Sequence, residues 1–238
     1  MKKRLGIVGG MGSLAGSWLF QRILNLSKVK SDQDHLEIII HNNTKIPDRT
    51  KAIVFNEESP LPELQRTLKL FNKGDVEVIV LACMTSYYYY DELVKSSKGE
   101  ILHPIGFVVD ELLNSKEFKS KKTIGLIGST GLIKSGLFQR ALEPLGFKVL
   151  TLYDDEQEKY FTEPIYKRVK TGTISDVTQD LFMQQIEIFQ HRKVDLIIGA
   201  CSEMPIFINK DKVKLPYIDV FELLAARVIT HCYNGYNN

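Results

Sequence analysis

Short apolar runs alternate with longer stretches of helical spacing along the whole chain. The runs are rich in the aliphatic and β-branched residues typical of buried strands, and most are bounded by glycine, proline or polar residues. They predict strands at 4–9, 37–41, 76–82, 104–107, 123–128, 148–152, 195–200 and 216–219, with helices between them at 13–27, 60–73, 132–144, 174–191 and 220–231. Such alternation is typical of parallel sheets covered by helices on both faces, so we expect an α/β fold.

The second half of this pattern repeats the first in the same order. "LGIVGGMG" at 5–12 matches "IGLIGSTG" at 124–131, "VEVIVLACMT" at 76–85 matches "VDLIIGACSE" at 194–203, and "HPIGFVVDEL" at 103–112 matches "LPYIDVFELL" at 215–224. Three matches in one order predict two pseudo-symmetric lobes, each a parallel-type sheet flanked by helices. The polar stretch at 114–122 sets the boundary, giving an N-terminal lobe of residues 1–115 and a C-terminal lobe of residues 116–238. The last helix, about 220–232, could pack back on the first lobe.

Composition and charge exclude several classes of partner. The 238 residues include 31 Lys and Arg against 29 Asp and Glu, and the basic residues are spread along the chain, so we expect no nucleic-acid partner. The longest apolar runs are far shorter than the roughly 20 residues that span a bilayer. The first ten residues break into glycines before the apolar part of a signal peptide can form. We therefore expect a cytoplasmic protein without a membrane partner.

Two of the three cysteines occupy matching places in the two halves. Cys83 and Cys201 each follow a predicted buried strand where a helix is expected to begin, and a helix N-terminus favours the reactive thiolate. Ligands collect at this edge of parallel sheets, so two lobes that face one another would place the two thiols on opposite walls of one cleft. Cys232 fits a buried apolar position. The chain has no CxxC pair and no close His–Cys cluster, so we expect neither a disulfide framework nor a metal site.

A glycine loop, "GGMGSLAG" at 9–16, follows the first predicted strand. It fits GxGxxA at Gly10, Gly12 and Ala15, but the second predicted strand ends in "HNN" where a dinucleotide site needs an acid. A P-loop is excluded because no Gly-Lys-Ser or Gly-Lys-Thr follows. The N–H groups of the loop could hold a small anion such as a carboxylate, or the loop could be a plain tight turn.

Other polar residues near these positions have more than one interpretation each. Thr85, Ser202 and Glu203 directly follow the two cysteines, where they could hydrogen-bond a substrate, tune a thiol or cap a helix. Arg49, in the turn-rich segment "NNTKIPDRT", could bind a carboxylate through two N–H groups or form a surface ion pair. The basic segment at 161–172 could equally be a solvated helix face.

With these motifs assembled, the sequence resembles the cofactor-independent aspartate/glutamate racemase superfamily, and within it the aspartate racemase group. The segments that carry the resemblance span nearly the whole chain: "GIVGGMGSLAG" (6–16), "NNTKIPDRT" (42–50), "ACMTSYYYYDEL" (82–93), "IGLIGSTGLIKSG" (124–136), "DDEQEKYFTEPIYKRVKTG" (154–172) and "GACSEMP" (199–205). The resemblance implies a racemase for aspartate or a related acidic amino acid. It also implies a homodimer that uses no cofactor, neither pyridoxal phosphate nor a metal.

The resemblance also assigns roles to individual residues. Cys83 and Cys201 match the two catalytic cysteines, one of which removes the α-proton from one face of the amino acid while the other gives a proton to the opposite face. Arg49 and Lys170 match the basic residues that bind the substrate carboxylates. The remaining substrate-binding candidates are Gly10, Met11, Met84, Thr85, Thr130 and Ser202, with Glu203 as an auxiliary residue.

Several positions depart from the pattern of that group. Met84 stands where an asparagine is usual, Tyr87 where a histidine is common, Gly16 where a threonine is common and Thr44 where a proline is frequent, and 200–202 read Ala-Cys-Ser instead of Gly-Cys-Thr. A methionine cannot make the hydrogen bonds of the asparagine amide. Two alternatives therefore stay open: a homologue that binds a small carboxylic acid without turnover, and a related isomerase or decarboxylase of small dicarboxylic acids.

Overall fold

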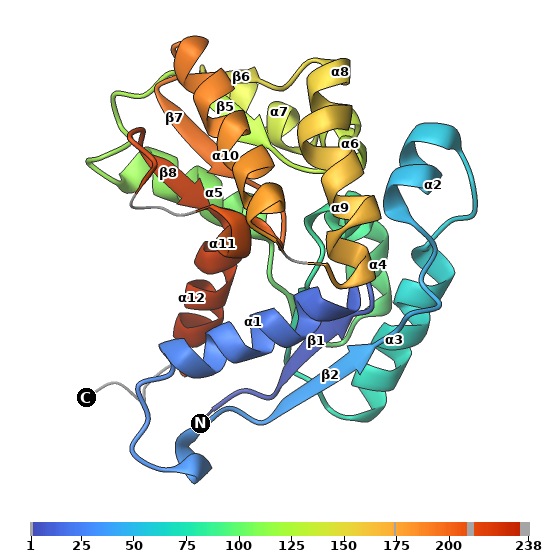
Figure 1. The fold of residues 1–238 in the computed structure, drawn as a ribbon. Coiled ribbons are helices and arrows are strands. Elements are labelled where there is room, and N and C mark those ends of the chain that lie inside the picture. The colour runs from blue at the N-terminus through green and yellow to red at the C-terminus, as the bar shows by residue number, and fades with distance from the viewer. Residues whose placement is uncertain (1, 174, 209–211, 234–238) are drawn as a thin grey trace. The chain divides into compact units, whose positions relative to one another are not determined.

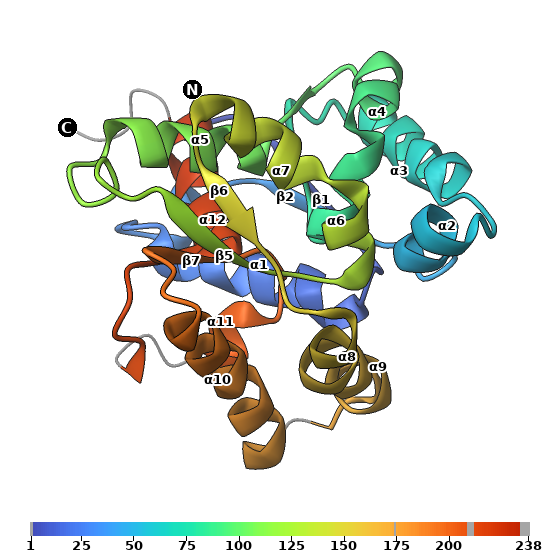
Figure 2. The same ribbon diagram turned by 90° about the horizontal axis from the view of Figure 1, so that it is seen from above.

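The computed structural model describes residues 2–173, 175–208 and 212–233, and the chain divides into two compact units (Figures 1 and 2). Of the described residues, the first unit contains those up to Pro104 and those from Glu222 to Tyr233, and the second contains those between Ile105 and Phe221. The first division between the units lies between Pro104 and Ile105. The sequence analysis predicted the boundary between residues 115 and 116. Helix α12 (Val220–Cys232) thus begins in the second unit and continues in the first.

The first unit is built on a four-stranded parallel sheet. Its strands are β1 (Leu5–Gly9), β2 (Ile38–Asn42), β3 (Val78–Leu81) and β4 (Glu100–Ile101), in the order β2-β1-β3-β4. Its helices are α1 (Ser13–Leu26), α2 (Arg49–Phe55), α3 (Leu61–Lys73) and α4 (Tyr90–Ser96), with 3-10 turns η1 (Asp32–Asp34) and η2 (Met84–Tyr89). Strands β1 and β3 are buried at every position, which explains why they are continuous apolar runs rather than alternating ones.

Helices α1 and α3 cover opposite faces of this sheet. On one face, the ring of Phe71 in α3 lies so close to Gly6 of β1 that an added Cβ atom would stand 2.8 Å from it. On the other face, α1 approaches β1 and β2 through Gly16, whose added Cβ would lie 3.4 Å from the Cα of Gly9 and 4.0 Å from Ile40. Two covered faces leave the ends of the strands as the part of the sheet where polar groups gather.

The second unit repeats this arrangement. Its strands are β5 (Thr123–Ile127), β6 (Lys148–Leu150), β7 (Leu196–Gly199) and β8 (Tyr217–Asp219), all parallel and in the order β6-β5-β7-β8. The helices are α5 (Pro104–Asn114), α6 (Thr130–Ser135), α7 (Leu137–Leu142), α8 (Asp154–Gln157), α9 (Glu163–Lys167), α10 (Asp176–His191) and α11 (Met204–Phe207), with short turns η3 (Glu143–Leu145), η4 (Glu158–Thr162) and η5 (Val169–Thr171). Helix α10 lies along one face, where Phe189 packs on Gly125 (Figures 1 and 2). The predicted α/β fold with two similar sheets is confirmed.

Two sequence-based element predictions are wrong. The segment 104–107 is the first turn of α5, because Pro104 occupies the first helical position, where its missing N–H leaves no hydrogen bond unmade. The fourth strand lies just before it, at Glu100–Ile101, and pairs with Val78 and Ile79. The single helix predicted at 132–144 is instead α6 and α7, separated at Gly136, whose φ of +68° is left-handed.

None of the helices in the described ranges is both long enough and apolar enough to span a membrane.

Candidate functional site

In the first unit, β1 leads into the glycine loop and β3 leads into Cys83, both at the carboxyl ends of the strands. Cys83 is a free, buried thiol two residues after the end of β3. Its carbonyl accepts hydrogen bonds from the backbone N–H of Ser86, at 3.1 Å, and from the Ser86 hydroxyl, at 2.5 Å. The chain then turns into η2, where Met84 and Thr85 are also buried. A 3-10 turn therefore follows this cysteine, in place of the regular helix that the sequence predicted.

The glycine loop is in contact with Arg49. The guanidinium donates from Nη2 to the carbonyl of Met11, at 2.8 Å, and from Nη1 to the carbonyl of Pro47, at 3.1 Å. Arg49 is only 7% exposed and is the first residue of α2, after an N-cap at Asp48 that accepts from the N–H of Lys51. The structure thus brings three predicted site residues, Gly10, Met11 and Arg49, into one local group, and Arg49 begins a helix rather than lying in a loop.

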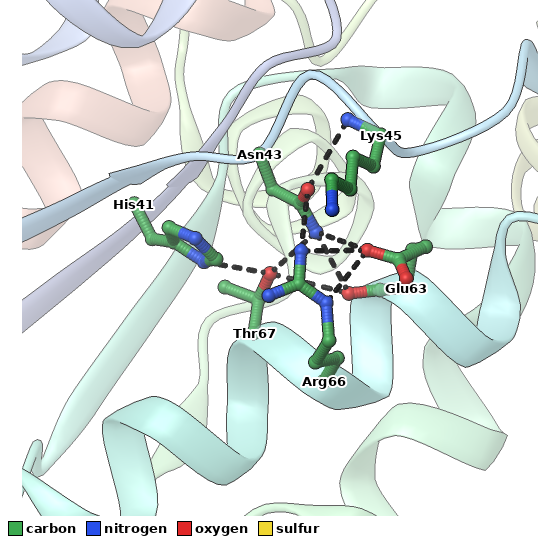
Figure 3. A network of polar contacts seen from close by, with 6 residues as sticks. All are labelled: His41, Asn43, Lys45, Glu63, Arg66 and Thr67. Carbon is green, nitrogen blue, oxygen red and sulfur yellow. Dashed lines mark hydrogen bonds and ion pairs between the residues drawn. The ribbon is translucent and has the colours of Figure 1, made fainter.

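A residue that the sequence analysis missed, Asn43, lies at the centre of a polar network beside this loop. Its side chain is buried and contacts Glu63, Arg66 and Thr67 of α3 (Figure 3). The sequence holds a weak signal for it, because Asn43 follows β2 directly, but asparagine after a strand is more often a turn residue.

Tyr87 anchors the end of β3 close to Cys83. Its side chain is 1% exposed, and its hydroxyl accepts a hydrogen bond from the N–H of Leu81 at 3.1 Å. Burial raises the pKa of the Tyr87 hydroxyl above its ordinary value of 10.0. The ring meets His103 edge-on, and burial lowers the pKa of His103 below its ordinary 6.5. The first of the four consecutive tyrosines is thus a core residue, whereas the next, Tyr88, is 44% exposed.

In the second unit, Cys201 follows β7 and lies beside a buried carboxyl. The Cys201 Sγ donates to Glu203 Oε2 at 2.8 Å, and the Ser202 hydroxyl donates to the same oxygen at 2.9 Å. Ser202 and Glu203 are 4% and 6% exposed, whereas Cys201 is partly exposed. The structure therefore brings three predicted site residues together: Cys201 and Ser202 both donate to one carboxylate oxygen of Glu203. Of the three side chains, the Cys201 thiol is the accessible one.

Thr130 lies at the start of α6 and is held by residues of the α8–η4 segment. Its hydroxyl is 3.0 Å from the hydroxyl of Thr162, and Gln157 donates from Nε2 to the carbonyl of Gly128 at 2.9 Å. Thr162 ends η4, a single π-helical turn of the kind that frequently occurs at functional sites. Gln157 and Thr162 are further residues that the sequence analysis did not single out.

Lys170 is an exposed residue of η5. Its ammonium lies 3.6 Å from the centroid of the Tyr166 ring, which is the geometry of a cation–π contact. In the same basic segment, Lys167 forms an ion pair with Glu163 at 2.9 Å. This part of the segment is therefore the solvated helix face that the sequence analysis gave as one interpretation.

The third cysteine differs from the other two. Cys232 is 0% exposed, and burial raises the pKa of its thiol to about 12. In the ranges that the structure covers, no group of three or more His, Cys, Asp or Glu side chains is arranged to hold a metal ion.

Comparisons with known proteins place these observations in one context. The Asp/Glu/Hydantoin racemase family matches residues 8–228. The chain is similar to the broad specificity amino-acid racemase RacX of Bacillus subtilis, with 24% identity over 231 residues that cover 95% of this chain and 96% of RacX. Among solved structures it is similar to the aspartate racemase of Picrophilus torridus, with a TM-score of 0.79, 27% identity and coverage of 97% and 94% of the two chains. An aspartate racemase homologue from Pyrococcus horikoshii has the same fold, with a TM-score of 0.75, 19% identity and coverage of 98% and 100%.

Proposed function

The chain belongs to the Asp/Glu/Hydantoin racemase family, and from this premise we propose that it is a cofactor-independent racemase of aspartate or a related acidic amino acid. One observation carries the proposal. Each of the two sheets, which have the same strand order, continues beyond its third strand in chain order into a cysteine, Cys83 after β3 and Cys201 after β7. Inversion at the α-carbon needs one proton acceptor and one proton donor, and two thiols at matching positions supply both.

In the proposed reaction, the thiolate of one cysteine takes the α-proton. The C–H bond breaks, an S–H bond forms, and the electron pair moves toward the adjacent carboxylate. The other cysteine, present as a thiol, then gives its proton to the opposite face of the α-carbon and becomes the thiolate. The reverse direction uses Cys83 and Cys201 in exchanged roles. Two residues are needed because a single base would return the proton to the face from which it came.

Glu203 supports the role proposed for Cys201. Cys201 Sγ lies 2.8 Å from Glu203 Oε2, within reach for the proton to pass to the carboxylate and leave the thiolate that proton abstraction requires. The hydroxyl of Ser202 donates to the same oxygen and holds the carboxylate in place. We propose that Glu203 acts through Cys201 and does not touch the substrate.

The negative charge that develops at the substrate carboxylate requires fixed hydrogen-bond donors, because such donors cost no reorganisation when the charge forms. We assign this role to the backbone N–H groups of Gly10 and Met11, with the hydroxyls of Thr85 and Thr130 as further donors, while the Ser202 hydroxyl stays on Glu203. Arg49 and Lys170 are the cations proposed to attract the substrate carboxylates. We also propose that the enzyme acts in the cytoplasm as a homodimer.

A second function is favoured by Met84. This side chain is 3% exposed and offers only a weak sulfur acceptor, so it supplies no donor to a substrate. A homologue that binds a small carboxylic acid without turnover fits that observation.

Proton NMR in D2O against L and D forms of aspartate, glutamate and other common amino acids separates the two functions. A racemase removes the α-proton signal of its substrate and produces the other enantiomer, which chiral chromatography detects. A binding protein is stabilised thermally by a dicarboxylate and leaves every α-proton in place. Absence of exchange with all amino acids would overturn the racemase proposal.

A further inference from the structure

We propose that Asn43 is a positioning residue, which fixes the glycine loop through a buried hydrogen-bond network and so sets the place of the N–H groups that stabilise the charge developing at the substrate carboxylate. Its side chain lies among β2, α3 and the β2–α2 connection, and its amide forms hydrogen bonds with other residues of the protein. The inference rests on the proposed function only in the role that it gives to the N–H groups of the loop. The structural part of the claim, that Asn43 holds the loop, stands separately.

The Asn43 amide is fully occupied by hydrogen bonds to its own unit (Figure 3). Nδ2 donates to Glu63 Oε2 at 2.9 Å, and it also lies 3.1 Å from the Glu63 carbonyl and 3.3 Å from the Thr67 hydroxyl. Oδ1 accepts from Arg66 Nη2 at 2.8 Å and from the N–H of Lys45 at 3.2 Å. Since Asn43 is 3% exposed, water has little access with which to replace these bonds.

The partners of Asn43 are themselves held by hydrogen bonds. Arg66 Nε donates to Glu63 Oε2 at 2.8 Å, so the carboxylate and the guanidinium hold the amide between them. Thr67 is 0% exposed, donates to the Glu63 carbonyl one helical turn earlier, and lies 3.0 Å from His41 Nδ1. The amide is therefore attached to the first turns of α3, a rigid element that also packs on the sheet through Phe71.

The backbone of Asn43 lies directly against the glycine loop. Strands β1 and β2 are paired in register up to Gly9 and Asn42, so the next residues, Gly10 and Asn43, also face one another. Gly10 has a φ of +90°, and a Cβ atom on it would collide with the Asn43 backbone, whose nitrogen would lie 2.7 Å away. Only glycine tolerates both conditions. Any shift of Asn43 must therefore move Gly10 or open a gap behind it.

Arg49 holds the next residue of the loop through the Met11 carbonyl. The glycine loop is thus fixed at Gly10 by packing against Asn43 and at Met11 by the guanidinium. Misplacement of binding groups by about 1 Å can lower turnover on the order of a hundredfold without removing any reacting group. Asn43 consequently acts on the reaction through the loop and is not itself a catalytic residue.

Hydrogen–deuterium exchange of the ligand-free protein tests the structural claim. The variants are Asn43→Ala, which deletes the amide, and Asn43→Asp, which keeps its shape but places a second carboxylate against Glu63. The control is Asn72→Ala, because Asn72 lies at the other end of α3 and likewise makes two side-chain hydrogen bonds of 2.9 Å, to Ser96 and Lys98. We expect amide exchange in the peptide covering residues 9–16 to rise about tenfold or more in both Asn43 variants and to stay at the wild-type rate in the control.

Steady-state kinetics test the consequence for turnover. We expect Asn43→Ala to lower kcat by about ten- to a hundredfold while KM changes less than about threefold, because the loop stabilises charge that develops after substrate binds. If Asn43→Ala does not fold, Arg66→Ala replaces it, since Arg66 is exposed but donates to the same amide oxygen. Arg66→Ala should give the same pattern with a smaller change.

The outcomes separate this inference from the proposed function. Unchanged exchange at residues 9–16 in the folded variants would overturn the positioning role, and so would turnover equal to that of Asn72→Ala. Loss of turnover that appears only in KM would also contradict it. If the wild-type protein exchanges no α-proton, the proposed function fails, but the hydrogen–deuterium comparison still decides whether Asn43 holds the loop.

Discussion

Replacement of Arg49 by alanine should destabilise the protein even when no substrate is present. The guanidinium donates to the carbonyls of Met11 and Pro47 at 2.8 Å and 3.1 Å and is 7% exposed, so its removal leaves both carbonyls without these partners. A hydrogen bond from a charged donor contributes about 1.5–3 kcal/mol. Because the second bond is longer and water can replace part of the interaction, we expect a total loss of about 3 kcal/mol. For a chain of this length, a loss of that size lowers Tm by about 6–12 °C.

Thermal unfolding followed by circular dichroism measures the effect. Lys51→Ala in the same helix is the matched control, because its ion pair with Glu57 is exposed, 3.5 Å long and expected to contribute less than about 0.5 kcal/mol. Arg49→Lys should fall between the two, since an ammonium can reach one carbonyl but lacks the forked geometry. A Tm for Arg49→Ala equal to or above that of the wild type would refute the reasoning. Residues that serve only a ligand commonly cost stability, so their removal does not lower Tm.

Three further predictions follow from the described contacts. Glu203→Ala should retain the fold, as judged by circular dichroism, but lower kcat by about ten- to a hundredfold, because Cys201 loses its proton acceptor; wild-type turnover in this variant would exclude that role. Burial lowers the pKa of His103 below 6.5, so the unfolded chain binds this proton more readily, and stability should hold above about pH 6.5 and fall below it. His103→Phe should flatten that slope in a series of thermal melts, and an unchanged slope would assign the dependence to other groups. In native protein, iodoacetamide should leave Cys232 unmodified and alkylate the partly exposed Cys201, as peptide mass spectrometry can show; rapid labelling of Cys232 would contradict its burial.

The fold could be predicted from the sequence wherever burial leaves a repeated pattern. Strands covered on both faces read as continuous apolar runs, and the recurrence of those runs in one order indicated two similar sheets. The prediction was wrong at 104–107, where "PIGF" is short and apolar and fits a strand or a buried helix equally. The two-residue strand β4 was missed because its position is set by pairing with β3, which is not visible in local sequence.

The candidate site could be predicted in part. Glycines and cysteines at strand ends could be selected as site candidates from the sequence, because few structures other than a turn or a site need them there. The use of Arg49 on backbone carbonyls and the burial of Asn43 could not be foreseen, because both depend on how the β2–α2 connection folds against α3 and the glycine loop. Spacing along the chain does not give the direction of a side chain in an irregular segment.

Early-time isotope incorporation during racemisation of aspartate in D2O tests the two-cysteine account most directly. One thiol removes the α-proton from one face and the other delivers a solvent-derived hydron to the opposite face. The enantiomer that forms should therefore carry α-deuterium while the remaining substrate is still protonated. Cys83→Ser and Cys201→Ser should each abolish that conversion. A product enantiomer that retains the original proton, or a serine variant that still interconverts the enantiomers at the wild-type rate, would contradict the account.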